Sequence, residues 1–135
     1  MDILSNTYIM SSVFTQIRNK QIPGIIFDDN GEFFVIHTNN PAQLGHLLVI
    51  PYQEVDNIFD LDHDTYHKLW DYVKMISQKL RRITKSHKIG IQVEGLEVPH
   101  VHVHLIPINK AGDMLGTSKD INTNSIYQLQ QKFIQ

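Results

Sequence analysis

The stretch that decides the fold is His100-Val101-His102-Val103-His104-Leu105-Ile106-Pro107. In an extended strand, successive side chains point to opposite faces of a sheet. The three histidines therefore line one face, and the apolar residues between them line the face that packs on a core. Pro99 and Pro107 limit the run, because a proline cannot donate to a sheet ladder. Three of the eight histidines of the chain fall within five positions, which predicts a functional row of imidazoles.

Two kinds of chemistry could use this row. Neutral imidazole is a common zinc ligand. However, alternate residues of a strand lie roughly 6.6 Å apart, so the Cα atoms of His100 and His104 are expected about 13 Å apart. Bringing all three rings onto one tetrahedral ion would need a strong bend. The alternative is covalent catalysis by one histidine, with its neighbours binding a substrate that has several anionic oxygens. Geometry favours this second interpretation and leaves the first open.

The composition limits the class of protein. A chain of 135 residues with 41% hydrophobic and 19% charged residues fits one soluble domain with a core of its own. The net charge of −2 argues against a general nucleic-acid binder, and the chain has no cysteine. Its first residues do not resemble a secretory signal, and no apolar run approaches the roughly 20 residues that span a bilayer. We expect a cytoplasmic protein that binds neither membranes nor specific nucleic acids.

Short apolar runs and turn signals predict a sheet. Asp28-Asp29-Asn30-Gly31 is typical of a hairpin, because Asn-Gly readily adopts the positive φ angles of a tight turn. Pro41 and Gly45 place a loop before the next apolar run. The five expected strands cover residues 25–27, 32–37, 46–51, 89–93 and 100–107.

One long helix is predicted from about Asp62 or Asp64 to Lys85, because apolar residues recur there at helical spacing. Its apolar stripe consists of Tyr66, Leu69, Trp70, Val73, Ile76, Leu80 and Ile83. A short helix should begin after Ser11 or Ser12 as its cap, and another after Thr123 or Asn124.

These elements predict an α+β fold, in which a mainly antiparallel five-stranded sheet carries the long helix on one face and the imidazoles on the other. Residues 1–135 should form a single domain. Its core covers about residues 12–108, residues 1–11 form a loose arm, and residues 109–135 form a C-terminal tail.

Residues 100–106 closely resemble the His-φ-His-φ-His-φ-φ signature of the histidine-triad (HIT) family of nucleotide-binding hydrolases and transferases, where φ is an apolar residue. The resemblance extends over roughly residues 12–108. The other matching segments are Ser12-Val13-Phe14, Pro23, Pro41 to Gly45, Gly45 to Pro51, Gly95 and Val98-Pro99.

The resemblance implies a role for each site histidine. His102 matches the nucleophile that attacks the α-phosphorus of a nucleotide and forms a nucleotidyl-histidine intermediate. His104 matches a residue that hydrogen-bonds the phosphate oxygens, and His100 one that supports the nucleophile and the departing group. His46 matches a fourth site histidine from the neighbouring strand.

The family resemblance also implies an apolar slot for the nucleoside, although the residues at those positions could equally be structural core. They are Val13, Phe14, Ile17 and Ile36. Family members are usually homodimers that pair through the long helix and a sheet edge. No cofactor is required, because phosphoryl transfer depends mostly on positioning and charge stabilisation, and a divalent cation is compatible with the same chemistry.

The chain departs from the family pattern at two positions and in one turn. The turn before the triad, residues 93–97, is shorter than the usual family loop, lacks the expected Asn and has Leu96 in place of Gln. Thr38 stands where many members have Asp or Asn to bind the ribose, and a threonine cannot make the two-pronged contact of a carboxylate. Glu97 stands where Ser or Thr often contacts the phosphate. Since a carboxylate repels a phosphate, Glu97 either points into solvent or binds a cationic leaving group such as an amine.

We therefore expect a nucleotidyl hydrolase or transferase that acts on a purine nucleoside phosphoramidate or a dinucleoside polyphosphate through His102. The departures at Thr38 and before the triad leave open a nucleotide-binding adaptor with little turnover. A zinc-dependent hydrolase that uses two triad histidines is the third alternative.

Overall fold

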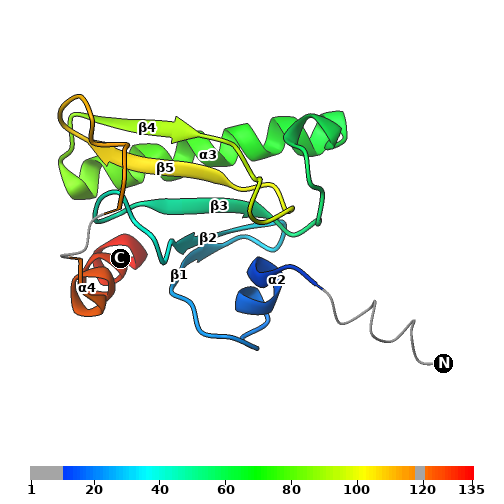
Figure 1. Ribbon diagram of the computed structural model, residues 1–135, viewed down its shortest axis with the longest axis horizontal. Coiled ribbons are helices and arrows are strands. Elements are labelled where there is room, and N and C mark those ends of the chain that lie inside the picture. Colours follow the sequence, from blue (N-terminus) through cyan, green and yellow to red (C-terminus); the bar gives the residue numbers. More distant parts are fainter. Residues whose placement is uncertain (1–10, 118–120) are drawn as a thin grey trace.

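Five strands form one antiparallel sheet in the order β1-β2-β3-β5-β4, with helices on both faces (Figure 1). This is the expected α+β fold. The computed structural model describes residues 11–117 and 121–135. The strands are β1 (Ile26–Asp29), β2 (Phe33–His37), β3 (Leu47–Pro51), β4 (Lys88–Gln92) and β5 (Val103–Ile108). The boundaries of β1 to β4 lie within two residues of the expected ones, which is the usual uncertainty of element ends.

The larger core lies between the sheet and two helices, α3 (His63–Thr84) and α4 (Thr123–Ile134). Leu69 and Ile76 of α3 are buried against inward-facing strand residues such as Leu47 and Leu105. Removal of this apolar surface from water stabilises helix and sheet together. The helical periodicity of the sequence correctly predicted this stripe.

A smaller core lies on the opposite face, under α2 (Val13–Arg18). Phe14 and Ile17 of this helix pack on the side chains of β2 and β3 that alternate away from α3. Ser12 is the N-cap, as expected, because its side chain accepts a hydrogen bond from the backbone N–H of Thr15. Beside α2, this face of the sheet is left open and carries the site.

The histidine run is not a regular strand along its whole length. β5 begins at Val103 rather than at His100. Before it, the chain turns: the His100 N–H donates to the Val98 carbonyl, and the Val101 N–H donates to the Val55 carbonyl. The expected common face therefore holds for His102 and His104, whose rings lie side by side, but not for His100, whose ring is fully buried.

β5 also continues past the proline that was expected to end it. Pro107 pairs with Ile89 of β4, and the strand ends at Ile108. A proline is tolerated here because β3 pairs with β5 only as far as Leu105, so no ladder on that side needs the missing N–H.

The C-terminal segment is packed rather than a tail. Phe133 of α4 is fully buried in the larger core. The helix is capped one residue earlier than expected, by Asn122, whose side chain accepts from the Ser125 N–H at 2.8 Å. Thr123 and Asn124 already belong to the first turn.

The expected loose arm lies, apart from Ser11, outside the described residues. Within residues 11–117 and 121–135, no helix is long and apolar enough to cross a membrane. A short 3-10 helix, η1 (Ile58–Asp60), leads into α3.

Candidate active site

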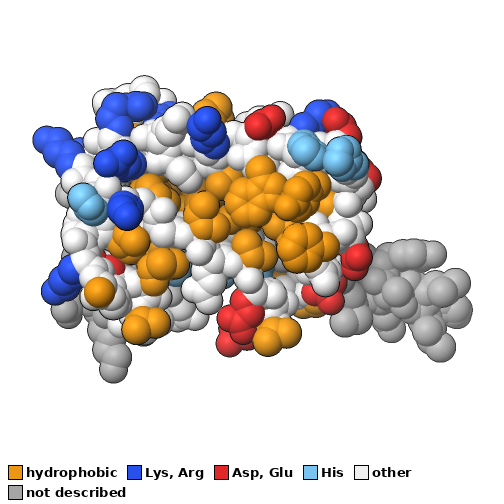
Figure 2. Space-filling view, turned by 90° about the horizontal axis from the view of Figure 1, so that it is seen from above, with side chains coloured by type: hydrophobic (Ala, Val, Ile, Leu, Met, Phe, Trp, Pro, Cys, Tyr) orange, Lys and Arg blue, Asp and Glu red, His pale blue; other side chains and the backbone are white. Residues whose placement is uncertain are grey.

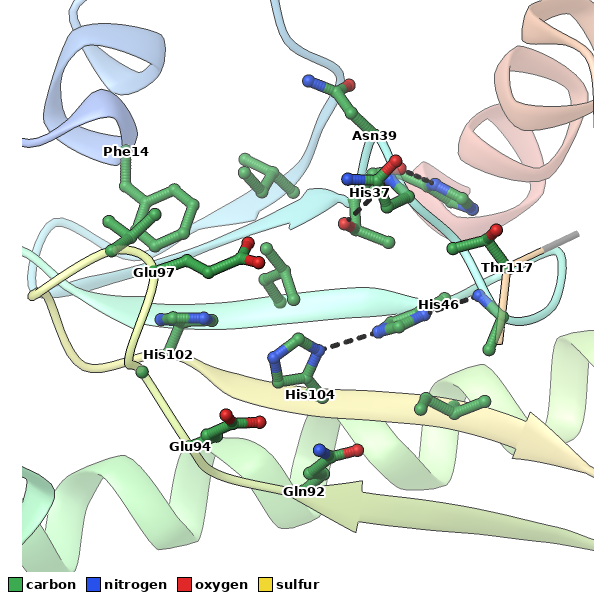
Figure 3. A pocket seen from close by; sticks show the side chains of 18 of the residues that line it. Phe14, His37, Asn39, His46, Gln92, Glu94, Glu97, His102, His104 and Thr117 are labelled. Carbon is green, nitrogen blue, oxygen red and sulfur yellow. Dashed lines mark hydrogen bonds between the residues drawn. The ribbon is translucent and has the colours of Figure 1, made fainter. Parts of the chain in front are cut away.

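A cavity of about 620 Å³ lies on the open face of the sheet, between α2, the ends of β2, β3 and β5, and the loops that follow them (Figure 3). His102, His104 and His46 line it, as do Thr38 and Glu97. So do all four residues expected to form the apolar slot, which are Val13, Phe14, Ile17 and Ile36. Nine of the ten residues singled out in the sequence therefore meet at one site.

His102 has one ring nitrogen held and one free for chemistry. Its Nδ1 lies 2.8 Å from the His100 carbonyl oxygen. A carbonyl can only accept, so Nδ1 carries the proton and Nε2 keeps its lone pair. The side chain is 7% exposed, and the Phe14 ring packs edge-on against it at 4.8 Å between centroids. Contact with the cavity thus leaves Nε2 accessible from one side.

His46 and His104 form a directed hydrogen-bond pair. The Ala42 N–H donates to His46 Nδ1 at 2.9 Å, so the proton of His46 resides on Nε2. This Nε2–H donates to His104 Nδ1 at 2.9 Å, which leaves the proton of His104 on its own Nε2. The ring centroids of His104 and His102 are 5.0 Å apart. His104 is therefore set as a hydrogen-bond donor beside the free nitrogen of His102.

Burial keeps these imidazoles neutral. Desolvation, together with smaller effects of the neighbouring imidazoles, lowers the pKa of His46 to about 3 and that of His104 to about 4. Burial also lowers the pKa of His102, although its hydrogen bond to His100 and the Glu94 carboxylate act in the opposite direction. A neutral His102 is the form that has a lone pair to attack with.

His100 is the one expected site histidine whose ring does not line the cavity. It is fully buried. Its Nε2–H donates to the Pro51 carbonyl at 2.8 Å, and its Nδ1 lies 2.5 Å from the Ser12 hydroxyl. Both ring nitrogens are thus occupied away from the cavity. The His100 carbonyl supports His102, but its imidazole has no free group to offer a departing group.

The apolar slot is also part of the smaller core. Phe14, Ile17 and Ile36 are buried, with at most 6% of their surface exposed, whereas Val13 is 38% exposed. These residues line the cavity and pack on the sheet at the same time, so the two interpretations of them are compatible.

The polar end of the cavity contains Thr38 and the carboxylates of Glu94 and Glu97. The Thr38 hydroxyl accepts from the Asn40 N–H at 3.2 Å, which still leaves its own proton to donate. Figure 3 shows Glu97 directed into the cavity and Glu94 beside His102 and His104. No lysine or arginine lines the cavity among the described residues.

Several lining residues escaped the sequence analysis. They are Asn39, Asn40, Gln92, Glu94, Leu96 and residues 114–117. Glu94 and Leu96 lie in the turn before the triad, where the departure from the family pattern gave a signal. The loop at 114–117 gave none, because its approach depends on tertiary contacts such as Gln43 Nε2 donating to the Asp113 carbonyl at 3.0 Å.

His37 holds the loop that follows β2. Its Nδ1–H donates to the Thr38 carbonyl at 3.0 Å, and the Gly45 N–H donates to its Nε2 at 3.0 Å. Gly45 has a φ of +90°, which favours glycine. His37 therefore joins the two ends of the loop that supplies Thr38 and Ala42 to the site.

No group of three or more His, Asp or Glu side chains in the described residues is arranged to hold a metal ion. The imidazoles of His46 and His104 already hydrogen-bond one another.

Comparison with known proteins identifies the family. The model of the HIT domain matches residues 19–111, and the chain belongs to this family. It is 30% identical over 102 residues to an uncharacterised HIT-like protein of Borreliella burgdorferi, covering 70% of this chain and 73% of that protein. It is 38% identical over 76 residues to the asymmetrical bis(5'-nucleosyl)-tetraphosphatase of Schizosaccharomyces pombe, covering 53% of this chain and 42% of that enzyme.

Solved structures share the fold. A HIT-like protein from Bartonella henselae matches with a TM-score of 0.79 at 19% identity, over 92% of this chain and 94% of that one. A hypothetical histidine triad nucleotide-binding protein from Sulfolobus tokodaii matches with a TM-score of 0.75 at 26% identity, over 90% and 88% of the two chains. A Zn-bound histidine triad family protein from Mycobacterium smegmatis matches with a TM-score of 0.77 at 22% identity, over 92% of this chain and 94% of that one.

The buried neutral histidines predict acid sensitivity. The unfolded chain binds protons at His46 near its ordinary pKa of 6.5, whereas the folded chain does so only near 3. Stability from this group is therefore complete above about pH 6.5 and is lost as the pH falls toward 3. Between pH 7 and pH 5 the loss should be about 1–2 kcal/mol, measured by urea unfolding.

The variant His46→Gln should flatten this pH dependence while lowering stability at pH 7. His67→Gln, which changes an exposed histidine of α3, is the matched control and should keep the wild-type dependence. Equal slopes for wild type and His46→Gln would contradict the assignment.

Proposed function

We propose that this protein is a nucleotidyl hydrolase or transferase. It breaks the bond between the α-phosphorus of a purine nucleotide and a leaving group, through a nucleotidyl intermediate on His102. The observation that carries the proposal is the free Nε2 of His102, which opens into the cavity while the His100 carbonyl holds the opposite nitrogen.

The reaction has two balanced steps. In the first, the Nε2 lone pair bonds to the α-phosphorus, the bond from phosphorus to the leaving nitrogen or oxygen breaks, and the leaving group takes up a proton. His102 then carries the nucleotidyl group as an imidazolium whose Nδ1–H still donates to His100. In the second, water attacks the phosphorus, the P–N bond to His102 breaks, and the nucleoside monophosphate leaves as the proton is returned to solvent.

Neighbouring groups fit the needs of these steps. The Nε2–H of His104 would donate to the phosphate oxygens as charge develops on them, and one such donor typically contributes about 10²–10³ in rate. Phe14, Ile17 and Ile36 offer the nucleoside an apolar surface, and the Thr38 hydroxyl can donate one hydrogen bond to the ribose. Glu94 would favour the positive charge that forms on His102.

Named relatives support the general chemistry. One is the tetraphosphatase of S. pombe, of whose length the chain spans less than half. Another is an AP-4-A phosphorylase of Mycobacterium tuberculosis, 26% identical over 73 residues and matched over 37% of its length. The competing function is a nucleotide-binding adaptor with little turnover, which the single hydroxyl of Thr38 favours.

His102→Ala should abolish turnover of an adenosine phosphoramidate while leaving nucleotide binding within about threefold, because the attacking ring is lost whereas the other residues that line the cavity remain. Wild-type protein quenched during turnover should gain the mass of one nucleotidyl group, and the variant should not. Wild-type activity should persist in a chelator. Binding without turnover by the wild type would instead identify the adaptor, and loss of activity in chelator would support the zinc alternative.

The charges around the cavity favour an amine as the leaving group. The cavity contains two carboxylates and no basic side chain among its described lining residues. A polyphosphate leaving group would meet Glu97 and Glu94 with like charge, whereas an amine that bears a second, cationic group would be attracted. We therefore propose nucleoside phosphoramidates with cationic leaving groups as the preferred substrates.

Two adenosine phosphoramidates test this preference, one made from a diamine and one from the alkylamine of the same length. Wild type should favour the cationic substrate in kcat/KM by about 2–10-fold, since ion pairs of exposed carboxylates are weak. Glu97→Gln should reduce this ratio toward one. Asp60→Asn changes an exposed carboxylate of η1 outside the cavity lining and is the control, which should keep the wild-type ratio. An unchanged ratio in Glu97→Gln would show that Glu97 does not contact the leaving group.

We also propose a homodimer that pairs through β4 and α3. Figure 2, which views this side, shows hydrophobic side chains gathered across it. Met75 of α3 and Ile91 of β4 are 52% and 48% exposed, and β4 is an edge strand. The Trp70 Nε1–H is buried without a hydrogen-bond partner in the described residues. A second copy would cover the patch and extend the sheet.

Ile91→Lys should convert the dimer to a monomer, as measured by light scattering, because it places a charge on the apolar edge. Lys74→Glu, on the exposed side of α3, should leave the dimer intact. A wild-type protein that is monomeric at high micromolar concentration would contradict the proposed assembly.

A further inference from the structure

The hydroxyl of Ser12 contacts the triad from outside the cavity. The sequence predicts Ser12 as a cap of α2 and places it in a segment that resembles the family, but it gives the side chain no role at the site. In the structure its Oγ lies 2.5 Å from His100 Nδ1, across 88 positions of the chain. The same side chain therefore caps the N-terminus of α2 and hydrogen-bonds a histidine of the triad.

The direction of this hydrogen bond follows from the other side of the ring. His100 Nε2 lies 2.8 Å from the Pro51 carbonyl, which can only accept. Nε2 therefore carries the proton, Nδ1 must accept, and the Ser12 hydroxyl must donate to it. The oxygen of the same hydroxyl accepts from the Thr15 N–H at 3.2 Å. The Thr15 hydroxyl oxygen is a second possible acceptor for the Ser12 proton, but at 3.5 Å it is much farther than His100 Nδ1, which is the better partner.

A carboxylate holds Ser12 in place. Oε1 of Glu54 accepts from the Ser12 N–H at 3.0 Å, and Oε2 accepts from the Thr15 hydroxyl at 2.8 Å. Glu54 itself is exposed, whereas Thr15 is buried. The first turn of α2 is thus tied to the segment that follows β3, and Pro51, the last residue of β3, supplies its carbonyl to His100.

The bonds continue to the nucleophile. The carbonyl of His100 accepts from His102 Nδ1–H at 2.8 Å. Phe14, two residues after Ser12, packs against both imidazoles, with centroid separations of 5.8 Å to His100 and 4.8 Å to His102. A shift of the His100 ring would therefore move the group that fixes the tautomer of His102 and a wall of the nucleoside slot together.

We propose that Ser12, supported by Glu54, is a positioning residue for the reaction on His102. It fixes the tautomer and orientation of the His100 ring. Through that ring it holds the His100 carbonyl and the Phe14 side chain in the positions that orient Nε2 of His102 for attack. This inference rests on the proposed nucleotidyl transfer and adds to it a residue that neither lines the cavity nor touches substrate.

Two substitutions of Ser12 separate positioning from helix capping. Glycine is nearly as good an N-cap as serine, so Ser12→Gly keeps the helix start and removes the donor to His100. Ser12→Thr keeps both the cap and the donor. Ser11→Gly, which deletes a neighbouring hydroxyl that makes none of these bonds, is the matched control.

For hydrolysis of an adenosine phosphoramidate, Ser12→Gly should lower kcat about 10-fold or more, because small misplacements of reacting groups are costly. KM should change less, and Ser12→Thr should restore most of kcat. In ¹⁵N spectra of histidine-labelled protein, Ser12→Gly should shift the Nδ1 resonance of His100, whereas Ser11→Gly should not. Glu54→Gln should have a smaller effect in the same direction, since this carboxylate is exposed.

Failure of the proposed nucleotidyl transfer and failure of the positioning role of Ser12 would give different results. If the wild type shows neither turnover nor a nucleotidyl adduct, the proposed function fails and this inference fails with it. If the wild type turns over and Ser12→Gly matches it in kcat, only the positioning role is overturned. A loss of kcat shared equally by Ser12→Gly and Ser12→Thr would also overturn it, because the donated hydrogen bond would not be the cause.

Discussion

The hydrogen bond from His102 Nδ1 to the His100 carbonyl is the constraint on which the site depends. A neutral imidazole carries one proton, and this bond places that proton on the nitrogen that faces away from the cavity. The other nitrogen is then a nucleophile at neutral pH without any neighbouring base to deprotonate it. Because the acceptor is a backbone carbonyl, the choice of tautomer depends on how residues 98–102 turn, and not on a side chain that could rotate away.

Similar bonds determine the protonation of the other site histidines. The Ala42 N–H determines which ring nitrogen of His46 carries the proton, and His46 in turn determines the tautomer of His104. The Pro51 carbonyl determines the tautomer of His100, whose remaining nitrogen accepts a hydrogen bond from the Ser12 hydroxyl. Burial lowers the pKa of all four rings, so they stay neutral and each presents one defined donor or acceptor. The same burial makes the fold sensitive to acid, since these groups cannot be protonated in place.

The fold and most of the site could be predicted because local patterns specify them. The apolar stripe of α3, the Asn-Gly turn and the serine cap each arise from residues close together in the chain. The family signature then assigned roles to the histidines by position. The predictions that were wrong concern the ends of β5, which starts at Val103 and not at His100 and continues past Pro107 to Ile108. These ends depend on how the strand pairs with its neighbours β3 and β4. Pairing of that kind depends on residues far apart in sequence.

By itself, the sequence determined that the chain has an α+β fold and belongs to the HIT family, and it placed three histidines at alternate positions of one short segment. Only the tertiary structure decided which nitrogen of each ring is free, because the partners of those nitrogens come from residues 12, 42, 51 and 100 on different elements. It also separated His100, fully buried, from the histidines that face the cavity. Alternation along a strand predicts a common face, but a turn in the backbone redirects individual side chains on it.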